Sequence, residues 1–321
     1  MGSSVAYHLA KLGRREIVLL EQGKIGCGTT WHAAGLVGQL RNTPSEIFLS
    51  CYGSKLYSEL EAETGQATGF KRCGSLTLAQ TDDRMIALRR NVARAKAFDI
   101  EGHMISPAEA NDMLGGILET KDLKGALWLP GDGTVSPSDL TASYIAGARQ
   151  NGVQIVENVT VTGFDVNESL GQITSVKTNK GEIKCDEIVN CGGQWARNIG
   201  KMAGVNVPLH SAEHFYVITD PLVPKASPHM PLFRDPDSYT YFREWSEGLC
   251  VGGFEPKCKP CFPVRNQKNQ IPESFEFALF DEGTFSPPSV VKYICTLNTC
   301  TLNEVLTLSL SLLPPCFKLT L

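Results

Sequence analysis

The sequence predicts a mixed α/β fold, and three observations support the prediction. A helical pattern over 3–12 leads into the apolar run 16–20, which has the length of a buried parallel strand. Short strands with tight spacing follow one another between 153 and 191, and the last of them ends in the pair Gly192 and Gly193. A crossover helix, a β-meander and a closing glycine turn are the layout of a Rossmann-like nucleotide-binding domain.

The size and composition of the chain limit its class. The 321 residues suffice for one large or two medium domains, and 42% hydrophobic and 20% charged residues are ordinary for a globular protein. The net charge of −4 favours neither a nucleic acid nor an anionic membrane as partner. No apolar run reaches the ~18 residues of a membrane span. The first residues resemble folded structure rather than a signal or transit peptide.

The other elements follow from periodicity and capping signals. Ser106, Pro107 and Glu109 have the spacing of a capped helix start, and Ser136 caps a second helix after a glycine-rich turn. Apolar spacing predicts helices over 44–63, 81–97, 106–114 and 136–150. Alternating residues predict a strand over 73–80, another near 125 and a strand-rich region over 213–254.

The eleven cysteines are scattered and odd in number, so we expect reduced thiols rather than a disulfide framework. Six lie in apolar or small-residue segments: Cys27, Cys51, Cys73, Cys185, Cys191 and Cys250. Cys258 and Cys261 form a single C-x-x-C. A zinc site is not expected because no second pair with ligand spacing follows.

Two features after the first helix suit a dinucleotide. Glu21 closes the buried strand, where an acid would accept hydrogen bonds from ribose hydroxyls, although a solvated strand end explains it equally well. The segment "GTTWHAAGL", residues 28–36, is small enough for its backbone to approach a flat group closely. Within it, His32 could act as a base or a covalent anchor, or it could be a satisfied buried histidine. No acidic or histidine cluster lies nearby, so a metal is not expected.

Two later segments can each be interpreted as a contact to the cofactor or as ordinary structure. The segment "VNCGGQWA", 189–196, predicts the end of an apolar strand followed by two glycines, which would meet a pyrophosphate at the start of the next helix. The alternative is a tight turn with a core tryptophan. The strand over 159–164 could meet an adenine edge or be an ordinary sheet strand.

A polar face is predicted in the region 213–254. His214 and Tyr216 alternate, as do Tyr239 and Tyr241, with Arg243 following on the same face. Such a face suits a small amphipathic amino acid, because arginine binds a carboxylate with two parallel hydrogen bonds. A half-exposed sheet face is the alternative.

Together these motifs resemble the FAD-dependent amine oxidoreductases related to dimethylglycine dehydrogenase and sarcosine dehydrogenase. The chain also resembles the regulatory subunit of pyruvate dehydrogenase phosphatase. The resemblance rests on "SVAYHLAKLG", "EIVLLE", "GTTWHAAGL", "PGDGTVSPSDL", "VNCGGQWARNIGKMAG" and "EHFYVIT", and it covers about 2–282.

The resemblance implies FAD as cofactor and assigns roles to residues. In catalytic relatives the histidine of W-H-A-A-G-L carries FAD covalently, which places this role on His32. His214 and Tyr241 are implied in the active site. The residues implied in FAD binding are Gly2, Glu21, Thr29, Thr30, His32, Ala34, Gly35, Leu36, Val161, Gly192 and Trp195.

The resemblance also implies how the chain is divided. We expect an FAD-binding segment over 1–40 without its first strand, a helical and substrate-domain segment over 41–135, and an FAD-binding return with a β-meander over 136–205. A substrate-domain sheet is expected over 206–283, and a disordered tail outside the family pattern over 284–321. The chain would then be a version of the family fold truncated at both ends.

The implied function is oxidation of an N-methyl amine, such as dimethylglycine or sarcosine, by hydride transfer to flavin. A small amine substrate, electron transfer to an electron-transferring flavoprotein and the mitochondrial matrix follow from the same resemblance. The alternative is a non-catalytic regulatory subunit, and the W-H pair at residues 31–32 favours the enzyme because regulatory relatives tend to lack it.

Overall fold

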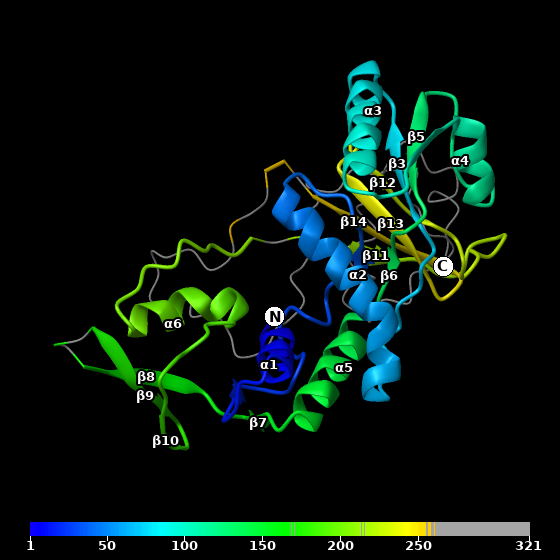
Figure 1. The fold of residues 1–321 in the computed structure, drawn as a ribbon. Coiled ribbons are helices and arrows are strands. Elements are labelled where there is room, and N and C mark those ends of the chain that lie inside the picture. Colours follow the sequence, from blue (N-terminus) through cyan, green and yellow to red (C-terminus); the bar gives the residue numbers. More distant parts are fainter. Residues whose placement is uncertain are drawn as a thin grey trace, which may run out of the picture.

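The computed structural model confirms a mixed α/β fold with two sheet regions joined by long helices (Figure 1). It describes residues 1–167, 169, 171–212, 214, 216–254, 256–257 and 260. The tail expected over 284–321 and the cysteines at 258 and 261 lie outside these residues.

The larger sheet region has seven strands in the order β11-β14-β13-β12-β3-β5-β4. Neighbours pair antiparallel except β12 and β3, which are parallel, so the sheet is mixed as the sequence implies. Its strands are β3 (Ser75–Ala79), β4 (His103–Ile105), β5 (Gly125–Leu129), β11 (Tyr216–Ile218), β12 (Leu232–Asp235), β13 (Thr240–Trp245) and β14 (Gly248–Gly253).

The remaining strands form three smaller sheets. Strands β1 (Val18–Glu21) and β7 (Gln154–Glu157) form a parallel pair, and β2 (Leu36–Val37) pairs antiparallel with β6 (Gly133–Thr134). A three-stranded antiparallel meander, β10-β9-β8, is the one predicted after the crossover helix. Its strands are β8 (Val161–Asn167), β9 (Gln172–Thr178) and β10 (Gly181–Lys184).

The predicted helices form where the sequence provides caps. Thr43 and Ser106 each complete a capping box with a glutamate three residues later, and the Ser136 hydroxyl accepts from the Asp139 amide. The helices are α1 (Gly2–Lys11), α2 (Pro44–Thr64), α3 (Asp82–Ala97), α4 (Pro107–Met113), α5 (Pro137–Gln150) and α6 (Ala196–Met202), the last preceded by a 3₁₀ turn, η1 (Gly193–Trp195).

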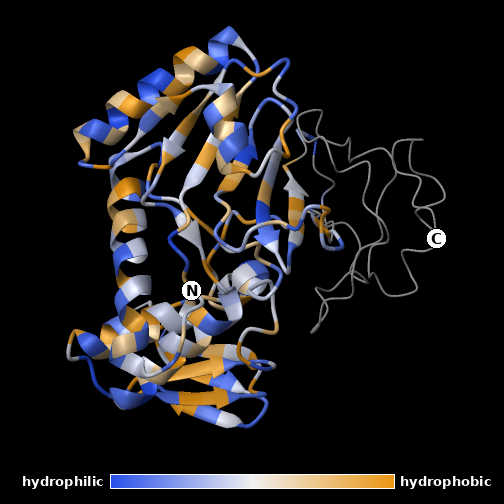
Figure 2. Ribbon diagram, turned by 90° about the vertical axis from the view of Figure 1, so that its right-hand side faces the viewer, coloured by the Kyte–Doolittle hydropathy of each residue, from blue (hydrophilic) through white to orange (hydrophobic). Residues whose placement is uncertain are grey.

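Separate hydrophobic clusters hold the two regions. On one face of the large sheet, Phe233 and Phe242 stack with their ring centroids 4.3 Å apart. Helices α1, α2 and α5 pack around the fully buried Tyr7 and Leu60. Figure 2 shows hydrophilic and hydrophobic residues alternating along the helices, as expected for helices with one buried face.

One predicted strand is absent from the described residues. The apolar run before Gly192 forms no strand, and its side chains Ile188 and Val189 are 36% and 58% exposed. A buried parallel strand needs a hydrogen-bonding neighbour, and no described strand pairs with this run. The expected strand was therefore wrong, although the glycine turn after it is present.

Candidate functional site

The loop over 28–36 presents a neutral histidine on a small-residue backbone. The Nδ1 atom of His32 lies 3.3 Å from the Gly28 carbonyl oxygen, and its ring lies against Trp31 with centroids 3.6 Å apart. Burial lowers the pKa of His32, and the hydrogen bond to Gly28 offsets this only in part. The imidazole is therefore uncharged near pH 7 and keeps one nitrogen lone pair as a nucleophile or base.

Glycines bring three predicted segments together around this loop. A Cβ atom added to Gly28 would lie 3.5 Å from the Trp195 ring. One added to Gly2, at the start of α1, would lie 3.3 Å from Leu19 and 3.4 Å from Cys191. The N-terminus of α1, strand β1 and the segment before η1 thus meet, and Gly28 of the loop lies next to Trp195.

The acid at the end of β1 is engaged locally. A carboxylate oxygen of Glu21 accepts a hydrogen bond from the Gly23 amide at 2.9 Å. The Glu21 carbonyl accepts from the Val159 amide at 2.9 Å, which places the start of β8, and hence Val161, next to the same strand end. The ribose-binding acid and the adenine-contacting strand of the sequence analysis are therefore neighbours.

A buried donor near Trp195 supports a ligand at this place. Gln194 Nε2 is buried and has no hydrogen-bond partner among the described residues. A buried amide without a partner costs about 1–3 kcal/mol, so such a group is commonly matched by a ligand or water. This amide fits a ligand that carries a hydrogen-bond acceptor. Thr30, Ala34 and Leu36 are half-buried in the same loop, whereas Thr29 is exposed.

Arg243 on β13 holds the end of the loop over 28–36. Its Nη1 donates to the Ala34 carbonyl at 2.7 Å and to the Val135 carbonyl at 3.2 Å. Gly35 adopts φ +73°, and a Cβ there would overlap the Val135 carbonyl oxygen. The Arg243 side chain of strand β13 therefore holds the loop by hydrogen bonds to backbone carbonyls. Binding of a substrate carboxylate by Arg243 stays a prediction, and its Nη1 donor serves this loop.

The two residues implied in the active site meet around one aromatic ring. Phe254 lies 5.6 Å from His214 and 5.4 Å from Tyr241, measured between ring centroids. However, His214 precedes β11 and is exposed, so it does not share a strand face with Tyr216 as predicted. Tyr239 also lies outside β13, in a turn with φ +56° that exposes its side chain.

Strand pairing places a polar row across the large sheet. Tyr216 lies opposite Gly252, Gly252 opposite Tyr241, Tyr241 opposite Arg234, and Arg234 opposite Thr77. The Tyr241 ring covers Gly252 so closely that a Cβ at that position would overlap it. The row lies on the face opposite the stacked phenylalanines, since side chains alternate along strands.

Sequence reasoning missed two charged residues of this face. Asp132, 3% exposed, accepts from the Ser75 hydroxyl at 2.6 Å and from the Gln39 amide at 2.8 Å, and burial raises its pKa. Desolvation lowers the pKa of Arg234. The "GDG" turn and the "FRD" strand in the sequence contain these residues, but their meeting depends on strand pairing that no local pattern reports.

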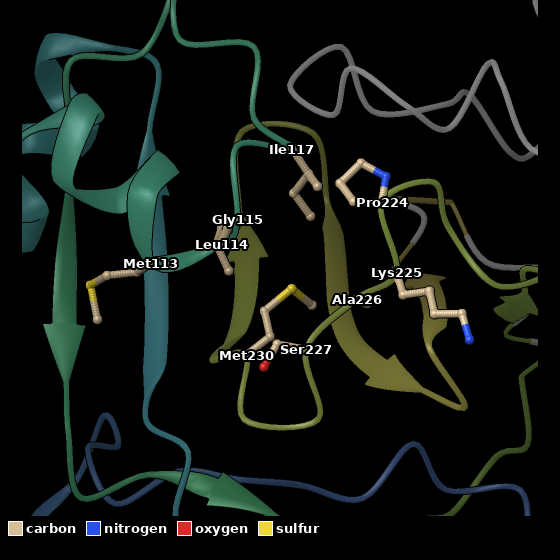
Figure 3. Close-up of a pocket in the computed structure, with 9 residues that line it drawn as sticks. All are labelled: Met113, Leu114, Gly115, Ile117, Pro224, Lys225, Ala226, Ser227 and Met230. Carbon is tan, nitrogen blue, oxygen red and sulfur yellow. The ribbon is translucent and has the colours of Figure 1, made fainter.

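A cavity of about 80 Å³ lies on the other side of the sheet (Figure 3). It lies between Leu114 and Ile117 after α4 and Pro224 and Met230 before β12. It is far smaller than the ~300–1,000 Å³ of a typical ligand pocket and lies among the core residues of the opposite face, so it is separate from the candidate site.

The part of the chain that the structure describes shows neither a metal cluster nor a membrane-spanning helix. Within the described ranges, no group of three or more histidines, cysteines or acids could hold a metal ion. None of the helices described is long and apolar enough to cross a bilayer. The six cysteines placed in apolar segments are free thiols, and Cys250 is buried.

Comparison with known proteins gives consistent matches. The family model described as "DAO: FAD dependent oxidoreductase" matches residues 1–285. The chain is 41% identical over 273 residues to the mitochondrial pyruvate dehydrogenase phosphatase regulatory subunit of Mus musculus, covering 84% of this chain and 30% of that protein. It is 38% identical over 285 residues to the mitochondrial sarcosine dehydrogenase of Homo sapiens, covering 88% and 30%. The chain thus spans under a third of the length of these two relatives.

A solved structure agrees with these matches. The L-proline dehydrogenase from P. horikoshii superposes with a TM-score of 0.71 at 28% identity, covering 78% of this chain and 66% of that one. The likeness expected to sarcosine dehydrogenases and to the phosphatase regulatory subunit is confirmed.

Proposed function

Because this chain belongs to the DAO family of FAD-dependent oxidoreductases, we propose that the protein oxidises an N-methyl amine such as dimethylglycine or sarcosine by hydride transfer to FAD. The observation that carries the proposal is the uncharged His32, held by Gly28 and Trp31 in a glycine-lined loop. FAD, when bound, would supply the two-electron chemistry that side chains lack.

The chain's own residues would bind and orient both partners. Residues 1–40 and 136–205 would form the cofactor side, and 41–135 and 206–283 the substrate side. Gly2, Gly28, Gly35 and Gly192 would line the cofactor, with Trp195 covering it and Glu21 and Val161 at its adenosine end. We further propose that His32 attaches the flavin covalently, since a neutral imidazole nitrogen is nucleophilic.

Tyr241 and His214 would position the amine. Both rings contact Phe254, which places a phenol and an imidazole next to the same apolar ring. An amine must be unprotonated to give up a hydride from its methyl carbon. The His214 imidazole would accept the amine proton, and the Tyr241 phenol would hydrogen-bond the freed nitrogen lone pair until oxidation begins.

Acid denaturation of the flavin-loaded protein tests the anchor. We expect yellow colour to remain with the precipitated protein, and His32→Ala to release it into the supernatant. His229→Ala is the matched control, because His229 is exposed and outside the site. A colourless precipitate from the unmodified protein, or a yellow one from His32→Ala, would contradict the anchor role.

The second candidate is a non-catalytic regulatory subunit, which the 41% identity to the phosphatase regulatory subunit favours. Oxidation of dimethylglycine or sarcosine, followed as formaldehyde release, distinguishes the two. Flavin-loaded protein that oxidises neither amine would support the regulatory role.

We also propose the mitochondrial matrix as location and an electron-transferring flavoprotein as acceptor. The mitochondrial names of the relatives support the location. Fractionation of mitochondria tests it, and amine-dependent reduction of the purified flavoprotein tests the acceptor. Recovery outside the matrix, or no reduction, would contradict the respective proposal.

A further inference from the structure

Gln194 holds a buried amide nitrogen that the described residues leave without an acceptor. Its Nε2 atom is buried and forms no hydrogen bond with them, whereas its Oε1 atom accepts from the Ser211 hydroxyl at 3.4 Å. A primary amide has two N–H donors, and removing them from water without a partner is unfavourable. The motif at 189–196 was assigned to the cofactor through Gly192 and Trp195, so this donor has no role in the proposed function.

The turn that carries Gln194 is closed by its own hydrogen bonds. Asn190 spans the turn, because its Nδ2 donates to the Ala196 carbonyl at 2.9 Å and its Oδ1 accepts from the Gly192 amide at 3.1 Å. The Trp195 amide donates to the Gly192 carbonyl at 2.9 Å. These bonds fix the backbone on both sides of Gln194, so the fold itself sets the place of the unpartnered amide.

The neighbours of Gln194 place it between the candidate cofactor loop and the candidate substrate side. The next residue, Trp195, lies 3.5 Å from where a Cβ of Gly28 would stand, and Gly28 begins the cofactor loop. On the other side, the Ser211 hydroxyl that bonds Gln194 lies three residues before His214, one of the active-site candidates. A ligand held by the loop and facing the substrate side would therefore pass close to the Gln194 amide.

We propose that the Gln194 amide donates a hydrogen bond to an acceptor on the isoalloxazine ring of FAD and so helps to hold the ring at the boundary with the substrate side. This inference rests on the proposed function and adds a binding residue to its site. The two ends of the amide have separate tasks, since Oε1 serves Ser211 and Nε2 is left for the ligand. The ring carries carbonyl oxygens and nitrogens that accept hydrogen bonds, and the pairing would satisfy the buried donor.

The test compares Gln194→Leu with Gln172→Leu, which removes an exposed glutamine from β9. Flavin-free protein is titrated with riboflavin, which has the ring without phosphates, and with ADP, which has the phosphates without the ring. We expect Gln194→Leu to raise the dissociation constant for riboflavin about 5- to 100-fold, the range for removing one partner of a buried hydrogen bond. Its dissociation constant for ADP should stay unchanged, and Gln172→Leu should bind both ligands as the unmodified protein does.

A second variant tests whether the position needs a donor. At about pH 8, Gln194→Glu puts a carboxylate opposite the ring acceptor, so riboflavin should bind more weakly than in Gln194→Leu. At about pH 5, part of the affinity relative to Gln194→Leu should return, because burial raises the pKa of a carboxyl and its protonated form can donate. Without ligand, Gln194→Leu should melt at the same or a higher temperature than the unmodified protein, since it removes an unpartnered amide.

Each outcome decides one statement. Riboflavin binding that depends on Gln194 in a protein that oxidises no N-methyl amine would refute the proposed function and keep the ring contact. Oxidation of dimethylglycine with unchanged riboflavin affinity in Gln194→Leu would refute the ring contact and keep the function. Weaker ADP binding in Gln194→Leu would assign the acceptor to the phosphates and overturn the inference. A flavin-free Gln194→Leu protein that melts at a lower temperature would show a structural glutamine, and an unmodified protein that binds no riboflavin would also overturn it.

Discussion

Replacing Arg243 with methionine should destabilise the protein by about 2–4 kcal/mol, whereas the same change at Arg234 should leave stability unchanged or raise it. The two arginines lie on neighbouring strands, β13 and β12, and both are partly buried. They differ in what their donors reach. Arg243 donates to three backbone carbonyls, those of Ala34, Val135 and Glu244, and Arg234 donates to no described atom.

The magnitude follows from these contacts. A hydrogen bond from a charged donor contributes about 1.5–3 kcal/mol, so the 2.7 Å bond to Ala34 and the longer 3.2 Å bond to Val135 together contribute about 3–5 kcal/mol. The net loss is smaller by about 1 kcal/mol, because methionine, unlike arginine, brings no charge into the partly buried sheet. The Arg243 guanidinium also lies 5.1 Å from the Trp245 ring, a contact that methionine replaces only in part.

Urea denaturation followed by circular dichroism measures both variants, with Arg90→Met as the exposed control. We expect the midpoint of Arg243→Met to fall at unchanged slope, and the midpoints of Arg234→Met and Arg90→Met to stay or rise. Equal losses at positions 243 and 234 would refute the reasoning, because partial burial alone would then explain both. A loss below about 1 kcal/mol at position 243 would show that the carbonyl contacts contribute little.

Three further changes test other parts of the fold. Gly35→Ala should lower the free energy of unfolding by at least about 1 kcal/mol because of the positive φ, and by more because the new Cβ would overlap the Val135 carbonyl. A smaller loss in urea denaturation would contradict the described loop. Thr43→Ala should cost about 1 kcal/mol by removing the cap of α2, again measured in urea, and no change would mean that the capping box does not form in solution. The hydrogen bond and ion pair with Lys11 lower the pKa of Glu63 from its usual 4.5, so this pair stabilises the fold above pH 4.5 and its contribution disappears as pH falls through the lowered value. Glu63→Gln should therefore flatten the acid limb of stability against pH, and an unchanged limb would contradict the ion pair.

Local signals explain why so much of the secondary structure was predictable. The helices after Thr43, Ser106 and Ser136 begin where a hydroxyl accepts from a backbone amide three residues on, and that spacing is visible in the sequence. The meander was predictable because alternation and turn residues are also local. Chain order then indicated a Rossmann-like arrangement without any long-range information.

The candidate site was predictable only where small residues mark a close approach. Gly28 and Trp195 belong to two motifs that the resemblance assigned to the cofactor, and they lie close together. The roles of the arginines were not accessible, because they depend on β12 pairing with β3, which joins residues more than 150 positions apart. The apolar run 188–191 failed for a related reason, since a strand exists only when another strand satisfies its backbone.

The separation of the small sheets from the large one bears on which parts of the protein open first. In the described residues, β1 and β7 pair only with each other, so each has an outer edge whose amides no strand protects, and Val18 and Val156 are 38% and 37% exposed. The inner strands of the seven-stranded sheet have neighbours on both sides and fully buried side chains such as Phe233. Native-state hydrogen exchange should therefore show early opening of the β1–β7 pair as a separate cooperative unit, well below global unfolding. Since Glu21 ends β1, a ligand that binds there should slow this exchange before it affects the large sheet.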